Sequence, residues 1–240
     1  MHKKIKINRL RKYNKKMFNY ILGIGLGLGS LLVIFIIIFA FWLSARLRKS
    51  KTKKIGYAFE KRVEKLITTW VGDKNKLFHP ASIYSYDDDK YFEVDGILIT
   101  ARAILVLELK SINGKITGKA DEPIWTKQIG NKIHDIKNPI IQNDKHIEHI
   151  LKMLNVKLPM LSVIVFDSKA EDVKIIDQPS HVVVTNEKNL TNILDEMDNF
   201  LNIKLNNSEM TYISDLLNKH KSNKKEDKKI HSSYTRQKQI

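Results

Sequence analysis

The segment Tyr91–Ser111, YFEVDGILITARAILVLELKS, decides the fold expected for this chain. It predicts two strands joined by a tight turn at residues 100–103. The second strand, Ile104–Lys110, is an almost continuous apolar run, which is typical of a strand covered on both faces. Glu108 and Lys110 lie two residues apart in this run, and because a strand has a period of two, their side chains point to one face.

Asp95 lies on the preceding strand and comes close to Glu108 and Lys110 if the two strands pair antiparallel. Charged side chains are rarely buried in a sheet unless they are paired or bound to a ligand. Two carboxylates with one ammonium group suit a divalent metal ion and an activated water. A buried carboxylate–lysine ion pair with a purely structural role explains the same pattern, and the local sequence leaves both interpretations open.

The composition bounds the classes of function. The chain has 240 residues, enough for one ordinary domain with extensions, and no cysteine, which excludes disulfides and thiolate metal sites. Its net charge of +16 is carried by the two ends, since residues 1–54 hold 14 Lys and Arg without an acid and residues 220–240 hold 7 against 2. Residues 55–219 hold 21 against 24, so the high charge is no evidence for a nucleic-acid-binding surface.

The N-terminal region predicts a membrane anchor. Residues 1–16 form a basic segment, and residues 17–45 contain no charged side chain. About 20 apolar residues span the bilayer core, and an uncharged run this long without a cleavage site indicates an uncleaved transmembrane helix with the lipid bilayer as partner. Residues 46–54 are a basic linker, which either rests on anionic headgroups or is a solvated flank.

This anchor predicts a single-pass protein of the cell membrane. The basic N-terminus favours the inner side of the membrane for that end of the chain. The domain after the anchor is therefore expected on the outer side. Two overlapping GxxxG pairs predict a weak homodimer through the membrane helix, although small residues are also common in such helices without any partner. The glycines concerned are Gly23, Gly25, Gly27 and Gly29.

The rest of the chain predicts an α/β domain over residues 55–219 and a disordered basic tail over residues 220–240. Helices are expected at 55–70, from Asn138-Pro139 onward, and at 190–203 and 210–217, with further short strands at 82–86, 115–118, 124–128, 161–166, 173–176 and 181–184. The run Asp87-Asp88-Asp89 is interpreted as a hairpin turn. His146 and His149 share a helix stripe with Gln142, as a metal pair or as a solvated or phosphate-facing pair.

This succession resembles the NERD (nuclease-related) domain, a branch of the PD-(D/E)XK nuclease superfamily, over residues 55–154. The matching pieces are GYAFEKRV with Glu60, EVDGILIT with Asp95, ILVLELKSINGKITG with Glu108 and Lys110, Trp125, and NPIIQNDKH with Gln142 and His146. The chain departs from the family at Gly96, where a histidine commonly follows the aspartate.

The resemblance implies a restriction-endonuclease-like mixed central sheet flanked by helices, here preceded by one transmembrane helix. It also implies a membrane-anchored nuclease that hydrolyses DNA or RNA with Mg²⁺ or Mn²⁺ bound at Asp95 and Glu108. Lys110 would orient or deprotonate the attacking water, with Gln142 and Glu60 in supporting catalytic roles. The alternative is a catalytically silent, membrane-tethered module for nucleic-acid binding or scaffolding, which the acidic balance of residues 55–219 favours.

Overall fold

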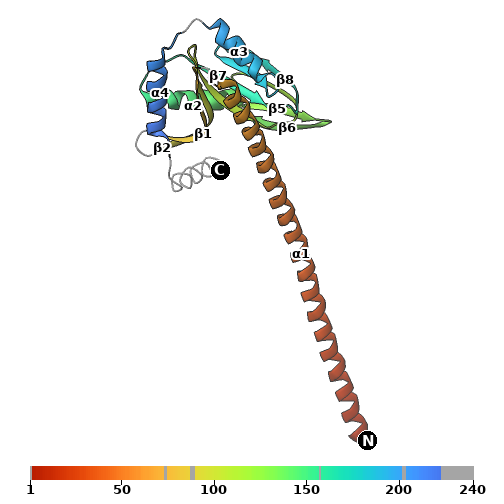
Figure 1. Ribbon diagram of the computed structural model, residues 1–240. Coiled ribbons are helices and arrows are strands. Elements are labelled where there is room, and N and C mark those ends of the chain that lie inside the picture. Colours follow the sequence, from red (N-terminus) through yellow and green to blue (C-terminus); the bar gives the residue numbers. More distant parts are fainter. Residues whose placement is uncertain (1, 73–74, 87–89, 157, 202–203, 223–240) are drawn as a thin grey trace. The chain divides into compact units, whose positions relative to one another are not determined.

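The computed structural model describes residues 2–72, 75–86, 90–156, 158–201 and 204–222, without the side chains of residues 2–16, 18–33, 49, 52 and 200. The chain divides into two compact units, residues 1–54 and residues 55–240. Helix α1 (His2–Val71) includes residues 46–54, so the linker predicted there is helical (Figure 1). That linker has no glycine or proline and is rich in lysine and arginine, which are good helix formers.

Several features predicted from the sequence lie outside the described part. The predicted membrane segment, residues 17–45, includes residues 18–33, whose side chains are not described, and the four glycines at 23–29 are among them. Within the described residues, no helix has an apolar stretch long enough to cross a membrane. The acidic turn 87–89 and tail residues 223–240 are likewise outside the described residues, whereas His220 at the start of the predicted tail belongs to a helix.

The domain contains a five-stranded mixed sheet. Its strands are β1 (Leu77–Tyr86), β2 (Lys90–Ile99), β3 (Ile104–Lys110), β7 (Met160–Phe166) and β9 (Val182–Asn186), in the order β1-β2-β3-β7-β9. Strands β1, β2 and β3 pair antiparallel, and β3, β7 and β9 pair parallel. The hairpin predicted between β2 and β3 is therefore confirmed, and the Thr100 hydroxyl accepts hydrogen bonds from two backbone N–H groups in its turn.

A second mixed sheet corrects the prediction of one central sheet. It consists of β4 (Gly114–Lys119), β5 (Ile124–Ile129), β6 (Lys132–Lys137) and β8 (Ala170–Ile176), in the order β6-β5-β4-β8. Strand β4 pairs parallel with β8, more than fifty residues away, instead of adding to β3. The buried Trp125 lies against Gly118, where any side chain would collide with the indole ring.

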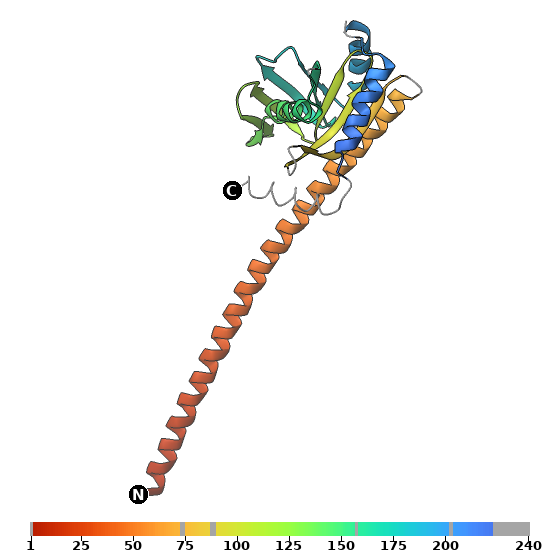
Figure 2. The ribbon, with the colours of Figure 1, turned by 90° about the vertical axis from the view of Figure 1, so that its left-hand side faces the viewer.

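Helices cover both faces of the five-stranded sheet. Helices α2 (Pro139–Leu154) and α4 (Asn207–His220) pack on the face that includes Ile104 and Val106, and Figure 2 shows α2 nearly end-on against the strands. The end of α1 and helix α3 (Leu190–Phe200) pack on the opposite face, against Leu105 and Leu107. Helix α2 begins where the sequence predicts, because the Asn138 side chain accepts from the N–H of Ile140 at 2.8 Å.

Candidate functional site

The site lies where β2 and β3 separate. Their pairing runs from Ile99–Ile104 to Gly96–Leu107 and then stops. Beyond this point, the N–H of Leu109 on β3 donates to the Asp95 carboxylate at 2.8 Å. This bond replaces a strand-to-strand hydrogen bond, and it fixes one oxygen of Asp95 beside the end of β3.

Gly96 allows this close approach of the strands. A Cβ at this position would lie 2.9 Å from Cδ1 of Leu107 and 3.1 Å from the ring of Phe78. The histidine that the family resemblance leads us to expect here therefore does not fit without repacking these two side chains. The departure from the family pattern leaves the placement of Asp95 intact.

Glu108 and Lys110 meet on one face of β3, as the period of the strand requires. The Lys110 ammonium lies 2.6 Å from one oxygen of Glu108, whose side chain is 2% exposed. The same ammonium donates to the amide oxygen of Gln142 on α2 at 2.8 Å. Lys110 is thus held between a strand carboxylate and a helix amide, so its position is fixed from two sides.

Helix α2 adds a residue that sequence reasoning left unassigned to the site. His146, one turn after Gln142, lies with Nε2 3.6 Å from the second oxygen of Glu108. Its neighbour on the stripe, His149, instead stacks on Tyr86 and lies 3.1 Å from the tyrosine hydroxyl. The two histidines have different partners, so the hypothesis that they form a metal-binding pair is not supported. The spacing Gln142-x-x-x-His146 was the signal that places both residues on one helix face.

Glu60 reaches the site region from α1 through a cavity of about 340 Å³. Four carboxylates line this cavity, from Glu60 and Glu64 on α1 and from Glu93 and Asp95 on β2, together with the ammonium of Lys61. Glu93 was missed by the sequence analysis, although its separation of two residues from Asp95 on one strand could have indicated it. The structure places the five predicted site residues in two groups: Glu60 and Asp95 line this cavity, whereas Glu108, Lys110 and Gln142 meet on the α2 side of β3. The hydrogen bond from the Leu109 N–H to Asp95 connects the two groups.

The electrostatics of the region show an excess of negative charge. Burial and the neighbouring Glu108 raise the pKa of Asp95 to about 7. Burial likewise raises the pKa of Glu108, against the lowering effect of Lys110. The pKa of Glu60 is raised by burial and then by Glu93. Lys110 and Lys61 oppose these shifts only in part, and a bound cation would relieve the remaining repulsion between the carboxylates.

The donor set fits a hard divalent cation. Mg²⁺ is commonly held by one or two carboxylates and several waters rather than by a full protein cage. Asp95 and Glu108 offer two carboxylates, and the adjoining cavity leaves room for water. Among the described residues there is no cluster of three or more His, Asp or Glu that forms a complete metal site. The arrangement therefore suits Mg²⁺ or Mn²⁺ better than a metal that needs several nitrogen ligands.

The raised pKa of Asp95 predicts a pH-dependent loss of stability without metal. Its native value of about 7 lies above the ordinary 3.8, so folding retains a proton that the unfolded chain releases. The retained proton therefore favours the folded state fully below about pH 4. This contribution to the free energy of unfolding is lost as the pH rises to 7. Asp95→Asn should therefore raise the melting temperature in EDTA at pH 8, by roughly 2–4 °C per kcal/mol, and much less at pH 5.

Thermal melts at both pH values check this prediction, with Asp172→Asn as the control because Asp172 is 46% exposed on β8. A difference between wild type and Asp95→Asn that is equal at pH 5 and pH 8 would show that the Asp95 proton plays no part.

Lysines that follow β3 do not gather around Glu108. In the described part of the chain, the ion pairs of Glu108 are with Lys110 and His146. Lys152 pairs with Glu148 on the surface of α2, and Lys119 lies near Asp121 and Asp177. Any basic surface for a polyanion must therefore be sought elsewhere on the domain.

Comparisons with known proteins find one family model and one relative that resemble this chain. The chain is 26% identical over 173 residues to an uncharacterized protein of Bacillus anthracis, which covers 71% of this chain and 79% of the relative. No solved structure matches. Residues 55–167, which contain Glu60, Asp95, Glu108, Lys110 and Gln142, match the family model of the nuclease-related domain, NERD.

Proposed function

We propose that the domain is a metal-dependent phosphodiesterase that hydrolyses DNA or RNA. The observation that carries this proposal is the half-buried carboxylate of Asp95 and the buried carboxylate of Glu108, both with raised pKa values, and the fixed ammonium of Lys110 beside Glu108. The match to the nuclease-related domain supports the same class of reaction. In this proposal the five-stranded sheet is the counterpart of the central sheet of restriction-endonuclease-like folds.

The residues divide the work of hydrolysis between them. A bound Mg²⁺ or Mn²⁺ supplies neutralisation of the phosphate charge and a lower pKa of coordinated water. Asp95, held by the Leu109 N–H, and Glu108 would provide the carboxylate oxygens for that ion. Lys110 stabilises the anionic transition state and orients the attacking water, and Gln142 keeps its ammonium in place. Glu60 adds negative charge from the α1 side of the cavity.

The test is hydrolysis by the purified full-length chain. Supercoiled plasmid and a labelled RNA are incubated with Mg²⁺, with Mn²⁺ and with EDTA. The proposal expects product from at least one substrate with metal and none with EDTA. Absence of product from DNA and RNA under every metal condition would reject it.

A scaffold or binding module is the second candidate. The short Lys110–Glu108 contact favours it, because a structural ion pair needs no metal and no turnover. The acidic balance of residues 55–219 points the same way. This candidate expects a stable fold that is indifferent to Mg²⁺, whereas the nuclease is expected to gain stability from the ion.

We also propose that residues 17–45 anchor the protein in the cell membrane, with the domain outside. The support is the uncharged run of 29 residues and the basic segment before it. Alkaline carbonate extraction of membranes should leave the full-length protein in the pellet, whereas a deletion of residues 17–45 should move it to the supernatant. Release of the intact protein would contradict the anchor. The homodimer through Gly23–Gly29 stays a prediction.

A further inference from the structure

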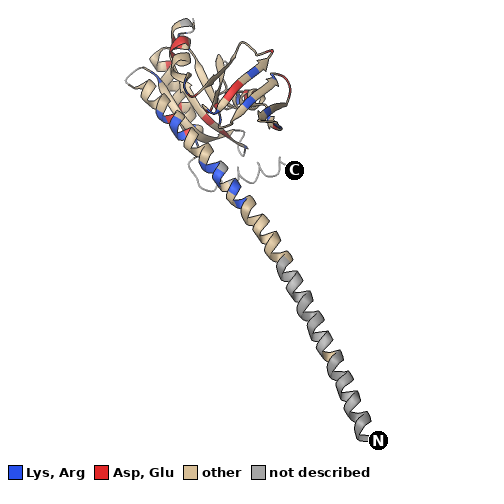
Figure 3. Ribbon diagram, turned by 90° about the vertical axis from the view of Figure 1, so that its right-hand side faces the viewer, with Lys and Arg blue, Asp and Glu red and all other residues tan. Residues whose placement is uncertain are grey.

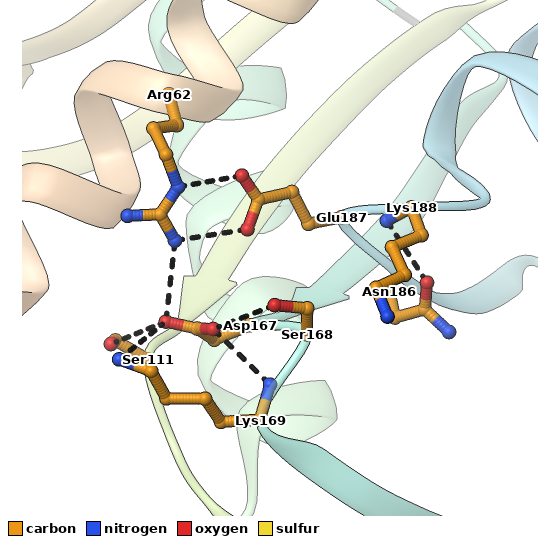
Figure 4. Close-up of polar contacts among 8 residues, drawn as sticks. All are labelled: Arg62, Ser111, Asp167, Ser168, Lys169, Asn186, Glu187 and Lys188. Carbon is orange, nitrogen blue, oxygen red and sulfur yellow. Dashed lines mark hydrogen bonds and ion pairs between the residues drawn. The ribbon is translucent and has the colours of Figure 1, made fainter.

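A groove lies between α1 and the segments that follow β7 and β9. It consists of two adjoining hollows of about 390 and 540 Å³, which share Arg62, Leu66, Glu187 and Thr191. Figure 4 shows the polar part of this region, where Arg62 from α1 faces Glu187 and the carboxylate of Asp167. Neither hollow contains any of the residues assigned to the phosphodiesterase site.

The acidic groups of the groove are already neutralised. Arg62 donates to both oxygens of Glu187, at 2.7 and 2.9 Å. The Asp167 side chain is 1% exposed and accepts from the hydroxyl of Ser111 at 3.2 Å and from the N–H of Lys169 at 3.2 Å. It also accepts from Arg62 at 3.5 Å, so neither carboxylate presents a free charge to solvent.

The cations of the groove, in contrast, reach solvent. The side chain of Lys169 is 60% exposed and that of Arg62 is 46% exposed, while Lys65 and Lys188 belong to exposed positions on α1 and after β9. Arg62 pairs with Glu187 and Asp167, and the Lys169 ammonium lies 4.0 Å from Asp167, so the net positive charge of the groove comes from Lys65 and Lys188. Helix α1 separates it from the cavity lined by Glu60, Glu93 and Asp95, and in Figure 3 the blue turns of α1 mark its basic residues.

The groove adjoins the proposed site through the end of β3. The N–H of Asp167 donates to the carbonyl of Lys110 at 3.0 Å, and Ser111, the next residue, bonds to the Asp167 side chain. Successive side chains point to opposite faces of a strand. Lys110 contacts Glu108 and Gln142 on the α2 side, whereas the hydroxyl of Ser111 donates to Asp167, which lines the groove.

We propose that this groove binds phosphates of the nucleic-acid backbone next to the bond that the site cleaves, an inference that rests on the proposed function. Exposed positive charge above buried carboxylates attracts a polyanion such as the phosphate backbone of a nucleic acid. The occupant is a nucleic-acid strand rather than a lipid surface, because the cations line a hollow whose Asp167 is hydrogen-bonded to Lys110 and Ser111 at the end of β3. A nucleic-acid strand has further phosphates on each side of the scissile phosphate. The acidic cavity would repel these phosphates, whereas the groove would attract them.

The experiment compares two double variants of the full-length protein. Lys65→Gln with Lys188→Gln removes two exposed charges from the groove, and Lys132→Gln with Lys219→Gln removes two exposed charges from β6 and α4. Fluorescence anisotropy with labelled duplex DNA and single-stranded RNA is measured with Ca²⁺ at several salt concentrations. Each lost phosphate contact lowers the slope of log K against log salt by about 0.9 for duplex and about 0.7 for single strands.

The groove variant should therefore bind roughly tenfold more weakly per lysine at 0.1 M salt, with a smaller salt slope, whereas the control variant behaves as wild type. Equal losses in both variants, or none in the groove variant, would overturn the inference. So would a groove variant that loses binding to phosphatidylglycerol vesicles and keeps binding to nucleic acid. Cleavage by wild type without any effect of the groove variant rejects this inference alone. Binding with the expected effect but without cleavage rejects the proposed reaction alone.

Discussion

Lys110→Ala is expected to lower the rate of phosphodiester hydrolysis by about 10²–10⁴-fold at saturating Mg²⁺, since a positioned proton-transfer group contributes about that much. The reason lies in the geometry, because Lys110 contacts both Glu108 at 2.6 Å and Gln142 at 2.8 Å. Without metal the variant also leaves buried Glu108 without its ammonium partner. Removing one partner of a buried pair costs about 3–5 kcal/mol of unfolding free energy.

Added Mg²⁺ should return most of that stability, because the ion then compensates Glu108, but it should not return the turnover. Melting curves and plasmid nicking on one preparation, with Mg²⁺ and with EDTA, measure both effects. Lys174→Ala is the matched control, since Lys174 forms an exposed pair with Asp172. If Lys110→Ala is equally destabilised with and without Mg²⁺, and wild type hydrolyses nothing, the lysine has a structural role only.

Asp95→Asn is expected to abolish binding of Mg²⁺ and Mn²⁺ in titration calorimetry. Asparagine keeps an oxygen that accepts from the Leu109 N–H, so the strands should hold their places while the second anionic ligand is lost. Wild-type affinity should fall by about tenfold per pH unit below pH 7, because the ion must displace the proton of Asp95, whose pKa is about 7. Glu93→Gln, in the same cavity, should weaken binding far less.

Equal Mn²⁺ affinity in wild type and Asp95→Asn would remove Asp95 from the ligand set. Loss of binding in Glu93→Gln alone would instead move the metal toward the Glu60 side of the cavity.

Local patterns predicted the centre of the domain well. The hairpin of β2 and β3 follows from alternation and from the apolar run before Glu108, and α2 begins at Asn138-Pro139 because the cap is local chemistry. The contact between Glu108 and Lys110 follows from the period of a strand, which does not depend on the rest of the fold.

Features that depend on distant partners were not predicted. The division into two sheets is decided by the pairing of β4 with β8, and no property of either strand alone specifies that partner. Strand β6 was missed because it is an edge strand whose residues are almost all exposed. Even its apolar Ile133 is 67% exposed, so no buried face marks the strand in the sequence. The Arg62–Glu187 contact joins residues 125 apart in the sequence. Only the folded chain therefore shows that Arg62, although close to Glu60 in sequence, lines the groove and not the acidic cavity.

Glu93 and Asp167 were within reach of sequence reasoning. Glu93 is two residues from Asp95 on a strand, and Asp167 directly follows the apolar run of β7. The ends of neighbouring parallel strands meet at one sheet edge, which brings Asp167 beside the end of β3. A search for acids after each buried strand would have found it.

The central claim is that Asp95 and Glu108 hold a divalent ion beside Lys110, and anomalous scattering from Mn²⁺-soaked crystals of the protein tests it most directly. We expect one strong anomalous peak in contact with both carboxylates in wild type and none there in Asp95→Asn. A wild-type crystal in Mn²⁺ with no peak at these carboxylates, and with Lys110 still bound to Glu108 as an ion pair, would contradict the account.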